Sequence, residues 1–431
     1  MRWPEIPLSI LLEDSQNGIW GSPPREDGSD LPVLRSTNIH NAALVLNDVA
    51  FRSVPEKSAK RYKLLDGDII VTTSSGSRHL IGKNALFQQP EDGQRYLFSN
   101  FTLRLRPRRD VISPRYLHLY LNSSKAKAEL LRLQNTTSGL RNLPIPLYLA
   151  QAVPLPPLSE QQRIVEILDQ ADALRKKRAE ADAKAARILP ALFYKMFGDP
   201  ATNPKGWPVK QLGDPQVTTI NPRFSSAGVS ANTQFSFLPM ADVDEVWGRT
   251  IGRQVRSYSD VMRGFTPFQD SDVLFAKITP CMQNGKAAIA RNLVNGHGFG
   301  STEFHILRSG PLATPEWLYA LVRLLWFKKQ AEASFTGTVG QQRVPADFLA
   351  RYTIGCPPIG LQRRFAKALV RLQEWVDQTD QSRKSLENLF SVLLYRAFTG
   401  DLTAKWREAH MKELLEEMEQ QAKALNLRVE P

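Results

Sequence analysis

The sequence PLPPLSEQQRIVEILDQADALRKKRAE, residues 154–180, has a counterpart in GCPPIGLQRRFAKALVRLQEWVDQTDQ, residues 355–381. Each stretch places a Pro-Pro pair directly before a run of helix-forming residues. At a separation of 201 residues the two copies align without a gap from Pro114 and Pro315 to Phe197 and Phe398. An internal repeat of this kind decides the fold class before any single motif does.

The repeat continues upstream with slightly larger separations, as expected where loops differ in length. WPEIPL (3–8) aligns with WPVKQL (207–212), and GDIIVTTSSG (67–76) aligns with SDVLFAKITP (271–280). Two copies are too few for a solenoid, so the sequence predicts an α+β fold. In it, two tandem mixed α/β domains are separated by a pair of long antiparallel coiled-coil helices. The expected segments are a first globular domain (1–155), a central helical spacer (156–200), a second globular domain (201–356), a distal helical spacer (357–400) and a helical tail (401–431).

The helical segments carry apolar residues at alternating steps of three and four, the 3.5-residue period of a coiled coil. In the first copy the predicted seam is Ile164, Ile167, Ala171, Leu174, Arg178, Ala181, Ala185, Ile188 and Leu192. In the second it is Phe365, Ala368, Leu372, Trp375, Thr379, Ser382, Leu386, Leu389 and Leu393. The simplest arrangement pairs the two seams with each other, and the alternative packs each helix only on its own domain.

Local signals refine this prediction. Ser159 and Gln162 form a capping box at the start of the first helix, whereas PPIG lacks it, which predicts a less defined start for the second helix. Pro190 is expected to interrupt the first helix. Antiparallel pairing would place Arg178 among Thr379, Asp380 and Ser382. The charged tail has a thin apolar stripe and either docks on a partner or extends into solvent.

Composition limits the class of protein. Lys and Arg exceed Asp and Glu by 13, a surplus that fits an anionic partner such as nucleic acid and, on charge alone, fits a merely basic soluble protein equally well. With two cysteines the chain has no disulfide framework or Cys-based zinc site, which fits a cytoplasmic protein. The sequence also shows no signal peptide and no membrane-spanning stretch.

Polar loops occupy matching places in both globular parts: TTSSGSRHLIGKN and QNTTSGLRN in the first, KITPCMQNGK and TGTVGQQR in the second. Their side chains are of the types that bond base edges and phosphates, although the same residues also make ordinary turns. The predicted DNA-contacting residues of the first copy are Ser75, Ser77, Arg78, His79, Lys83, Arg141 and Asn142. Those of the second are Lys277, Thr279, Gln283, Asn284, Lys286, Gln341, Gln342 and Arg343.

Catalytic motifs are absent from the sequence. GSRHLIGKN is similar to a phosphate-binding loop, but five residues separate its glycines and Asn84 stands where Ser or Thr belongs, so it is interpreted as a turn. INPRF (220–224) resembles an amino-methyltransferase motif but has Arg223 for its second proline, and it too is interpreted as a turn. No histidine or cysteine spacing suits zinc, and the only nuclease-like Asp-x-Lys lies within the coiled coil. The chain is therefore expected to bind without catalysing a reaction.

Nearly the whole chain resembles a known protein family. Tandem units that begin with W-P-x-x-x-L and end with PPLSEQQRIVEILDQADAL and LFYKMFGD are similar to DNA-specificity (S) subunits of type I restriction–modification enzymes. The resemblance implies two target-recognition domains that read a bipartite, asymmetric double-stranded DNA site, across a gap set by the paired helices. It also implies docking to two methyltransferase (M) subunits and to restriction (R) subunits, with S-adenosylmethionine, ATP and Mg²⁺ on those partners. It further implies a bacterial or archaeal cytoplasmic protein with no membrane contact.

Two other functions stay open on the residues alone. One is a DNA methyltransferase or nuclease that acts by itself. The other is a coiled-coil scaffold that does not contact DNA.

Overall fold

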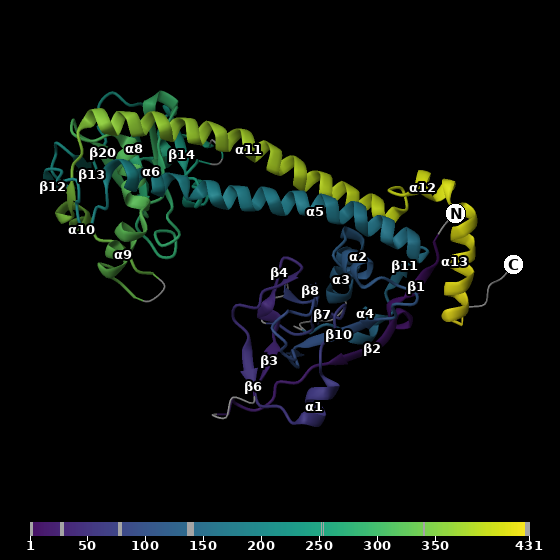
Figure 1. The fold of residues 1–431 in the computed structure, drawn as a ribbon. Helices are drawn as coiled ribbons and strands as arrows, with labels where there is room; N and C mark the ends of the chain where they lie inside the picture. Colours follow the sequence, from purple (N-terminus) through teal and green to yellow (C-terminus); the bar gives the residue numbers. More distant parts are fainter. Residues whose placement is uncertain are drawn as a thin grey trace. The chain divides into compact units, whose positions relative to one another are not determined.

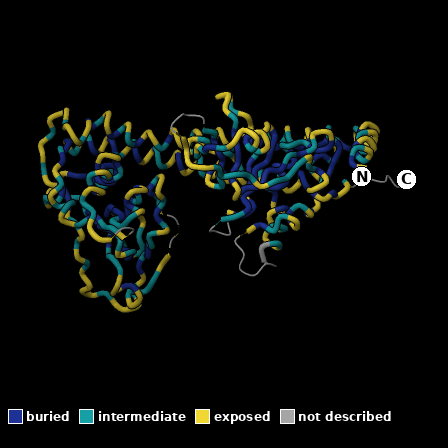
Figure 2. Tube along the Cα trace, turned by 90° about the horizontal axis from the view of Figure 1, so that it is seen from below, coloured by how far each residue is buried: buried dark blue, intermediate teal, exposed yellow. Residues whose placement is uncertain are grey.

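The computed structural model describes residues 3–25, 30–75, 80–135, 142–250, 252, 254–338 and 341–426 (Figure 1). The chain forms two compact units. Unit 1 comprises residues 1–176 and 384–431, and unit 2 comprises residues 177–383. Each unit contains a part of both long helices. The two units are defined by contacts between residues, whereas the five predicted segments are consecutive ranges of the sequence. Buried residues concentrate inside each unit (Figure 2).

Unit 1 is built on an antiparallel sheet of four strands in the order β2-β10-β7-β8. The strands are β2 (Leu12–Asn17), β10 (Thr102–Pro107), β7 (Ile69–Thr72) and β8 (Asn84–Leu86). A second sheet, β6-β3-β9, contains β6 (Ala50–Arg52), β3 (Leu31–Leu34) and β9 (Leu97–Phe98), with β3 and β9 parallel. Two short pairs complete the strands: β1 (Glu5–Pro7) with β11 (Ala152–Pro154), and β4 (Ile39–His40) with β5 (Ala43–Leu44).

Helices cover these sheets. They are α1 (Glu56–Arg61), α2 (Pro114–Leu121), α3 (Ser124–Asn135) and α4 (Ile145–Leu149), with short 3₁₀ turns η1 (Leu8–Leu11) and η2 (Ser36–Asn38). The residues PRYLHLYL form α2. Ser113 caps it by accepting from the Tyr116 N–H, and Pro114 occupies the first turn, where its missing N–H has no consequence.

Unit 2 repeats this architecture. Its sheet β13-β20-β17-β18 contains β13 (Thr218–Ile220), β20 (Phe304–Ser309), β17 (Val273–Ala276) and β18 (Ala287–Ile289). Its second sheet, β15-β14-β19-β16, contains β15 (Gln254–Ser257), β14 (Gln234–Leu238), β19 (His297–Gly300) and β16 (Thr266–Gln269), with β14 and β19 parallel. β12 (Val209–Gln211) pairs with β21 (Thr353–Gly355) as β1 pairs with β11. The helices are α7 (Tyr258–Val261), α8 (Pro315–Arg323), α9 (Leu325–Ala333) and α10 (Ala346–Arg351), with 3₁₀ turns η4 (Met240–Asp242) and η5 (Val294–Gly296).

The same interactions stabilise the four-stranded sheet that contains β7 in unit 1 and the one that contains β17 in unit 2. The central strands β7 and β17 are buried along their whole length, as apolar runs require. Arg106 makes a two-pronged ion pair with the buried Asp68 in unit 1, and Arg308 makes the same pair with the buried Asp272 in unit 2. The predicted internal repeat and fold class are confirmed.

The long helices are α5 (Leu158–Ala186), which continues as α6 (Ile188–Phe197), and α11 (Ile359–Thr399). Pro190 has no N–H, and its ring clashes with the carbonyl oxygen four residues earlier, that of Ala186. The predicted interruption is therefore confirmed, at Arg187. Ser391 stands at the matching position of α11, and that helix is continuous.

The antiparallel pairing of the helices is confirmed within each unit. In unit 1 the Arg175 guanidinium of α5 lies 4.3 Å from the Phe390 ring of α11 and bonds to Glu387 at 2.8 Å. In unit 2 Phe193 and Phe197 of α6 pack edge-on against Phe365 of α11.

The predicted seam has the right period, and Ile167 and Ala181 are half-buried as expected, but it is wrong at four other apolar positions. Leu174, Ile188, Trp375 and Leu389 are 52%, 46%, 40% and 46% exposed. The residue after each of them faces the partner helix instead, so that buried or half-buried positions run Ile164, Leu168, Ala171, Arg175, Arg178, Asp182, Ala185 and Leu189. Arg178 pairs with Asp182 on its own helix and lies over Trp375, which corrects the partner expected for it.

The predicted capping box is also wrong, because Ser159 lies inside the first turn of α5. Gln161 stabilises this helix start instead. Its Nε2 donates to the carbonyls of Val111 and Pro156, and its Oε1 accepts from the Ser113 N–H. Gln362 makes the equivalent three bonds at the start of α11, so the second helix starts as well defined as the first.

The tail forms α12 (Ala404–Ala409) and α13 (Met411–Ala424), and both helices pack on unit 1. The Arg407 Nε donates to the fully buried Glu160 at 2.8 Å, and Thr403 and Trp3 donate to the same carboxylate. Leu414 and Leu425 are buried. Of the two alternatives for the tail, solvated extension is wrong for the described residues up to 426, and the surface on which it docks belongs to its own chain.

Candidate nucleic-acid interface

The predicted loops of unit 1 meet at the end of β7. The Leu143 N–H donates to the Thr73 carbonyl at 2.7 Å, and Ser74 forms an isolated bridge with Asn142. The Thr72 N–H donates to the Lys83 carbonyl at 2.8 Å. Three predicted residues, Ser75, Lys83 and Asn142, are thereby brought to one edge of the sheet, and the side chains of Lys83 and Asn142 are exposed. Ser77, Arg78, His79 and Arg141 lie outside the described residues.

Unit 2 brings its predicted loops together through the same backbone bonds. The Val344 N–H donates to the Lys277 carbonyl at 2.9 Å, and the Thr279 N–H donates to Gln342 at 3.0 Å. The Ala276 N–H donates to the Lys286 carbonyl at 3.0 Å. The described parts of both loop sets therefore lie at matching places in the two units, and DNA contact by any of these residues stays a prediction.

Arg343 is occupied in the free protein. Its Nε and Nη2 donate to the Glu303 carboxylate at 3.0 and 2.8 Å, and its Nη1 donates to the Gln341 carbonyl at 2.8 Å. The hydrogen bond from Arg343 lowers the pKa of the Glu303 carboxyl, and partial burial opposes that shift. A base contact by this guanidinium would have to replace the Glu303 pair.

Other predicted residues of unit 2 also bond to acidic side chains. Gln283 donates to Glu332, and Asn284 donates to Glu245 at 3.2 Å. The Lys286 Nζ donates to the Met240 carbonyl and lies 3.8 Å from Glu245, which leaves its side chain 13% exposed. Lys83, its counterpart in unit 1, is exposed, so the two loops present different charge despite their shared backbone.

Two residues behind the unit 2 loops were missed by the sequence analysis. The His305 Nε2 bonds to the Val344 carbonyl at 2.8 Å, and its Nδ1 bonds to the Asn221 side-chain amide at 3.1 Å. Burial lowers the pKa of His305. Asn221 has a φ of 50°, which confirms a turn at INPRF, and this turn was the only available signal for the pair.

The loop that is similar to a phosphate-binding loop does not fit that role. Residues after Gly82 enter strand β8, whereas a phosphate-binding loop leads into a helix whose N–H groups face the phosphates.

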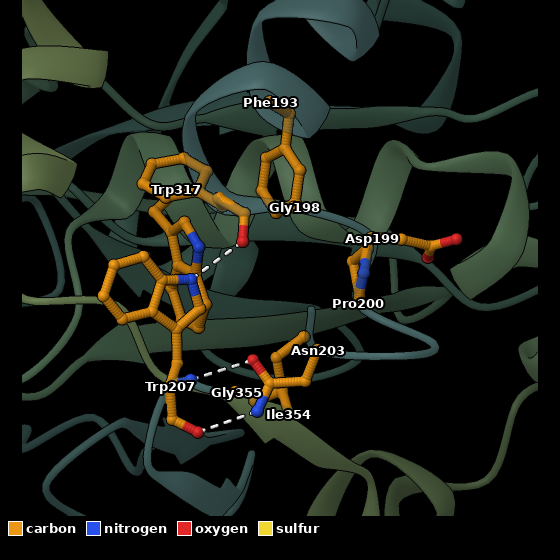
Figure 3. A pocket seen from close by; sticks show the side chains of 10 residues that line it. Phe193, Gly198, Asp199, Pro200, Asn203, Trp207, Trp317, Ile354 and Gly355 are labelled. Atoms are coloured by element: carbon orange, nitrogen blue, oxygen red, sulfur yellow. Dashed lines mark hydrogen bonds between the residues drawn. The ribbon is translucent and has the colours of Figure 1, made fainter. Parts of the chain in front are cut away.

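Two hollows lie in unit 2 away from these loops. The smaller, with room for about one water, lies at the end of α6, where Trp207 donates to the Phe197 carbonyl and Asn203 bonds both backbone groups of Trp207 (Figure 3). The larger is an open cleft of about 550 Å³ whose walls include Phe224, Phe235 and His297. No predicted site residue lines either hollow.

Comparisons with known proteins agree with this arrangement. The family model described as the type I restriction modification DNA specificity domain matches residues 24–182. The EcoEI specificity subunit of Escherichia coli is 28% identical over 245 residues, which cover 54% of this chain and 40% of that relative. The StySPI specificity subunit of Salmonella potsdam is 24% identical over 404 residues, 88% of this chain and 83% of the relative.

These matches confirm the resemblance to type I restriction–modification DNA-specificity subunits. The alignment with EcoEI spans well under two thirds of that relative's length. A chain from a structure of a type I R-M system has a TM-score of 0.52 at 18% identity and covers 93% of this chain and 98% of its own, which shows a shared fold.

The similar proteins are named specificity subunits, as expected for a chain that binds without catalysis of its own. Among the described residues no group of three His, Cys, Asp or Glu side chains could hold a metal ion. In the same part of the chain no helix is both long and apolar enough to cross a membrane.

Proposed function

We propose that this chain is the DNA-recognition subunit of a type I restriction–modification complex and that each unit reads one half of a bipartite, asymmetric site. The observation that carries the proposal is the repeated loop arrangement. Ser75, Lys83 and Asn142 in unit 1, and Lys277, Thr279 and Arg343 in unit 2, lie at the same edge of the same sheet. A net charge of +13 favours the approach of both edges to phosphate.

Because equivalent positions carry different side chains, the two DNA half-sites have different base sequences. Asn142 and Arg343 occupy matching positions next to the bridging segments. An amide pairs well with adenine in the major groove, and a guanidinium pairs well with guanine.

Matched substitutions at this pair of positions test the assignment. Asn142→Ala should relax specificity in the first half-site alone, and Arg343→Ala should relax it in the second alone, each by about 1–3 kcal/mol. Sequencing of modified adenines after co-expression with a methyltransferase subunit measures both. Equal changes in both half-sites, or no change in either, would contradict the proposal.

Glu303→Gln is the companion variant. It keeps the shape of the side chain that holds Arg343 and removes the negative charge beside the DNA. If Arg343 must leave Glu303, binding of the second half-site should become tighter and more sensitive to salt, because no carboxylate then competes for the guanidinium. Unchanged binding together with a loss in Arg343→Ala would mean that Arg343 acts on DNA without leaving the pair.

Partner docking is supported by apolar residues that the long helices leave exposed at equivalent positions. Leu174 matches Trp375, Ile188 matches Leu389, and Tyr194 matches Tyr395, and all six are at least 37% exposed. A repeated apolar stripe suits two copies of one partner. We assign these stripes to two methyltransferase subunits, with restriction subunits joining the resulting complex.

Stoichiometry tests this docking. Leu174→Asp should remove one methyltransferase subunit and Trp375→Asp the other, whereas the double variant should remove both. Mass measurement of the co-purified complex distinguishes these outcomes. Retention of two subunits by the double variant would disprove docking on the stripes.

S-adenosylmethionine, ATP and Mg²⁺ are assigned to the partner subunits. Incubation of the purified chain with radiolabelled S-adenosylmethionine and DNA should leave the DNA unlabelled until a methyltransferase subunit is added. Labelling by the chain alone would identify a stand-alone methyltransferase. Failure of the chain to retain DNA at low salt would instead favour a scaffold.

A further inference from the structure

Helix α13 of the tail covers the start of α5 in unit 1. The Gln421 Nε2 donates to the carbonyls of Val111 and Pro156 at 2.9 and 3.3 Å, and both carbonyls also accept from Gln161. The Glu417 carboxylate accepts from the Ser159 N–H at 3.0 Å, which satisfies a donor that the first turn of a helix leaves free. One carboxylate and one amide, four residues apart, therefore attach α13 to this helix start.

The start of α11 in unit 2 presents the same groups, and among the described residues no helix bonds to them as α13 does in unit 1. Gln362 donates to the carbonyls of Leu312 and Pro357, each at 2.8 Å. The Leu312 oxygen also accepts from the Cys356 thiol at 3.5 Å, whereas the Pro357 oxygen keeps a second lone pair for another donor. Leu312 is 36% exposed, whereas Val111, its counterpart in unit 1, is fully buried. Pro358 and Gly360 are exposed, and a side chain added at Gly360 would meet nothing within 4 Å.

Charge around this helix start is unbalanced. The first turn of α11 has no acidic residue, and Arg363, Arg364 and Lys367 are exposed just after it. The helix dipole adds a partial positive charge at the same end. A carboxylate placed as Glu417 is placed in unit 1 is the complementary group.

Two differences from unit 1 define the occupant further. Leu361 stands where unit 1 has Glu160, and Gly310 stands where unit 1 has Arg108, which bonds to the last turn of α13. An occupant of unit 2 therefore needs an apolar side chain opposite Leu361 and no equivalent of Arg407. Without a buried ion pair its attachment is reversible.

We propose that Leu312, Pro358, Gly360 and Leu361 form a docking surface for an amphipathic helix of a partner polypeptide. That helix carries a carboxylate and an amide four residues apart, as α13 does with Glu417 and Gln421. The proposal is independent of DNA recognition, because it rests only on the comparison of the start of α5 with the start of α11.

A peptide of residues 411–426 serves as the probe, with a lactam between Lys412 and Glu416 to hold it helical. Both side chains are exposed on α13, so the link leaves the docking face free. The peptide lacks Arg407 and cannot reproduce the ion pair that anchors the chain's own tail. Fluorescence anisotropy with the full-length chain measures its binding.

The expected result is one bound peptide per chain, with affinity reduced at least about tenfold by Gly360→Trp in the chain. Glu417→Lys or Gln421→Leu in the peptide should each weaken binding. Gln378→Trp, at an exposed position farther along α11, is the matched control and should bind like the wild type. Both chain variants should keep the wild-type melting temperature, because neither side chain enters the core.

Two results would overturn the proposal. One is the absence of binding by the helical peptide. The other is equal binding by the wild type and Gly360→Trp, which would mean that the peptide exchanges with the tail on unit 1.

Discussion

Unit 1 and unit 2 share a scaffold and differ at its edges. Strand order, the buried Arg–Asp pair behind the sheet and the glutamine at the helix start are the same in both. The helix start is covered by α13 in unit 1 and exposed in unit 2, and the matching loops bear Asn142 in one and Arg343 in the other. The groups that satisfy buried backbone atoms are therefore the same in both copies, whereas the surface residues differ.

The largest difference between the units is the buried carboxylate of Glu160. Arg407→Leu should destabilise unit 1 by about 3–5 kcal/mol, because it leaves this carboxylate buried with less compensation. Urea unfolding of the full chain measures the loss. The added change Glu160→Leu, which copies Leu361 of unit 2, should recover most of it. A double variant as unstable as the single one would show that Arg407 acts through packing and not through the ion pair.

Equivalent seam positions should respond alike in the two units. Leu168 and Leu369 are both buried, and Asp at either position should cost about 3–4 kcal/mol as an unpaired buried charge. Hydrogen exchange should localise the Leu168→Asp effect to unit 1 and the Leu369→Asp effect to unit 2. Leu174→Asp is the exposed control and should change stability by less than about 0.5 kcal/mol. A large loss of stability in Leu174→Asp would show that Leu174 lies in the seam, as the sequence predicted.

The units should also differ in their response to acid. His118 of α2 is buried where unit 2 has Tyr319, and burial, helped by the nearby Arg115, lowers the pKa of His118 to about 4. Below its ordinary pKa of about 6.5 the unfolded chain takes up a proton that the folded chain refuses. Stability should therefore fall as the pH drops from about 6.5 to about 4, by at most about 3 kcal/mol for this group.

Unfolding free energies measured across that range test the assignment. His118→Tyr, which copies unit 2, should flatten the pH dependence whatever its effect on stability at neutral pH. The facing groups Asp169 and Asp172 are present in both proteins and do not distinguish them. Parallel curves for the two proteins would assign the acid sensitivity elsewhere.

The smallest expected change concerns the spacing of the two half-sites, and it rests on the proposed function. Four residues added near 181 and four near 382 lengthen each helix by about 6 Å. At about 3.4 Å per base pair, the preferred gap should grow by one or two base pairs while both half-site sequences stay the same. Methylation mapping on sites with varied gaps measures it. A constant gap would exclude the paired helices as the element that sets spacing.

The sequence predicted the features that the internal repeat shares between its copies. It did not predict the features that depend on contacts between residues far apart in the chain. The 3.5-residue period located the helix pair, but the choice of the most apolar residue in each turn favoured Leu174 and Trp375. The seam instead takes Arg175, whose charge lies over the Phe390 ring. No local pattern distinguishes an apolar residue of the seam from one exposed beside it.

The same limit applies to the interface. Loop positions followed from the repeat, whereas the partners of the loop residues did not. Glu303 reaches Arg343 across 40 residues of sequence, and Gln161 finds its carbonyl partner Val111 across 50. The capping box was a plausible local solution, but a tertiary bond took its place.

Pro190 gives unit 2 a mechanical asymmetry. One member of its helix pair is jointed at Arg187, while its partner α11 runs unbroken past the same level. A bending load on such a pair strains the hydrogen-bond ladder of the continuous rod, whereas the jointed rod turns at a point where that ladder is already interrupted. Bending of this helix pair should therefore concentrate at Arg187, the residue where Pro190 interrupts the first helix.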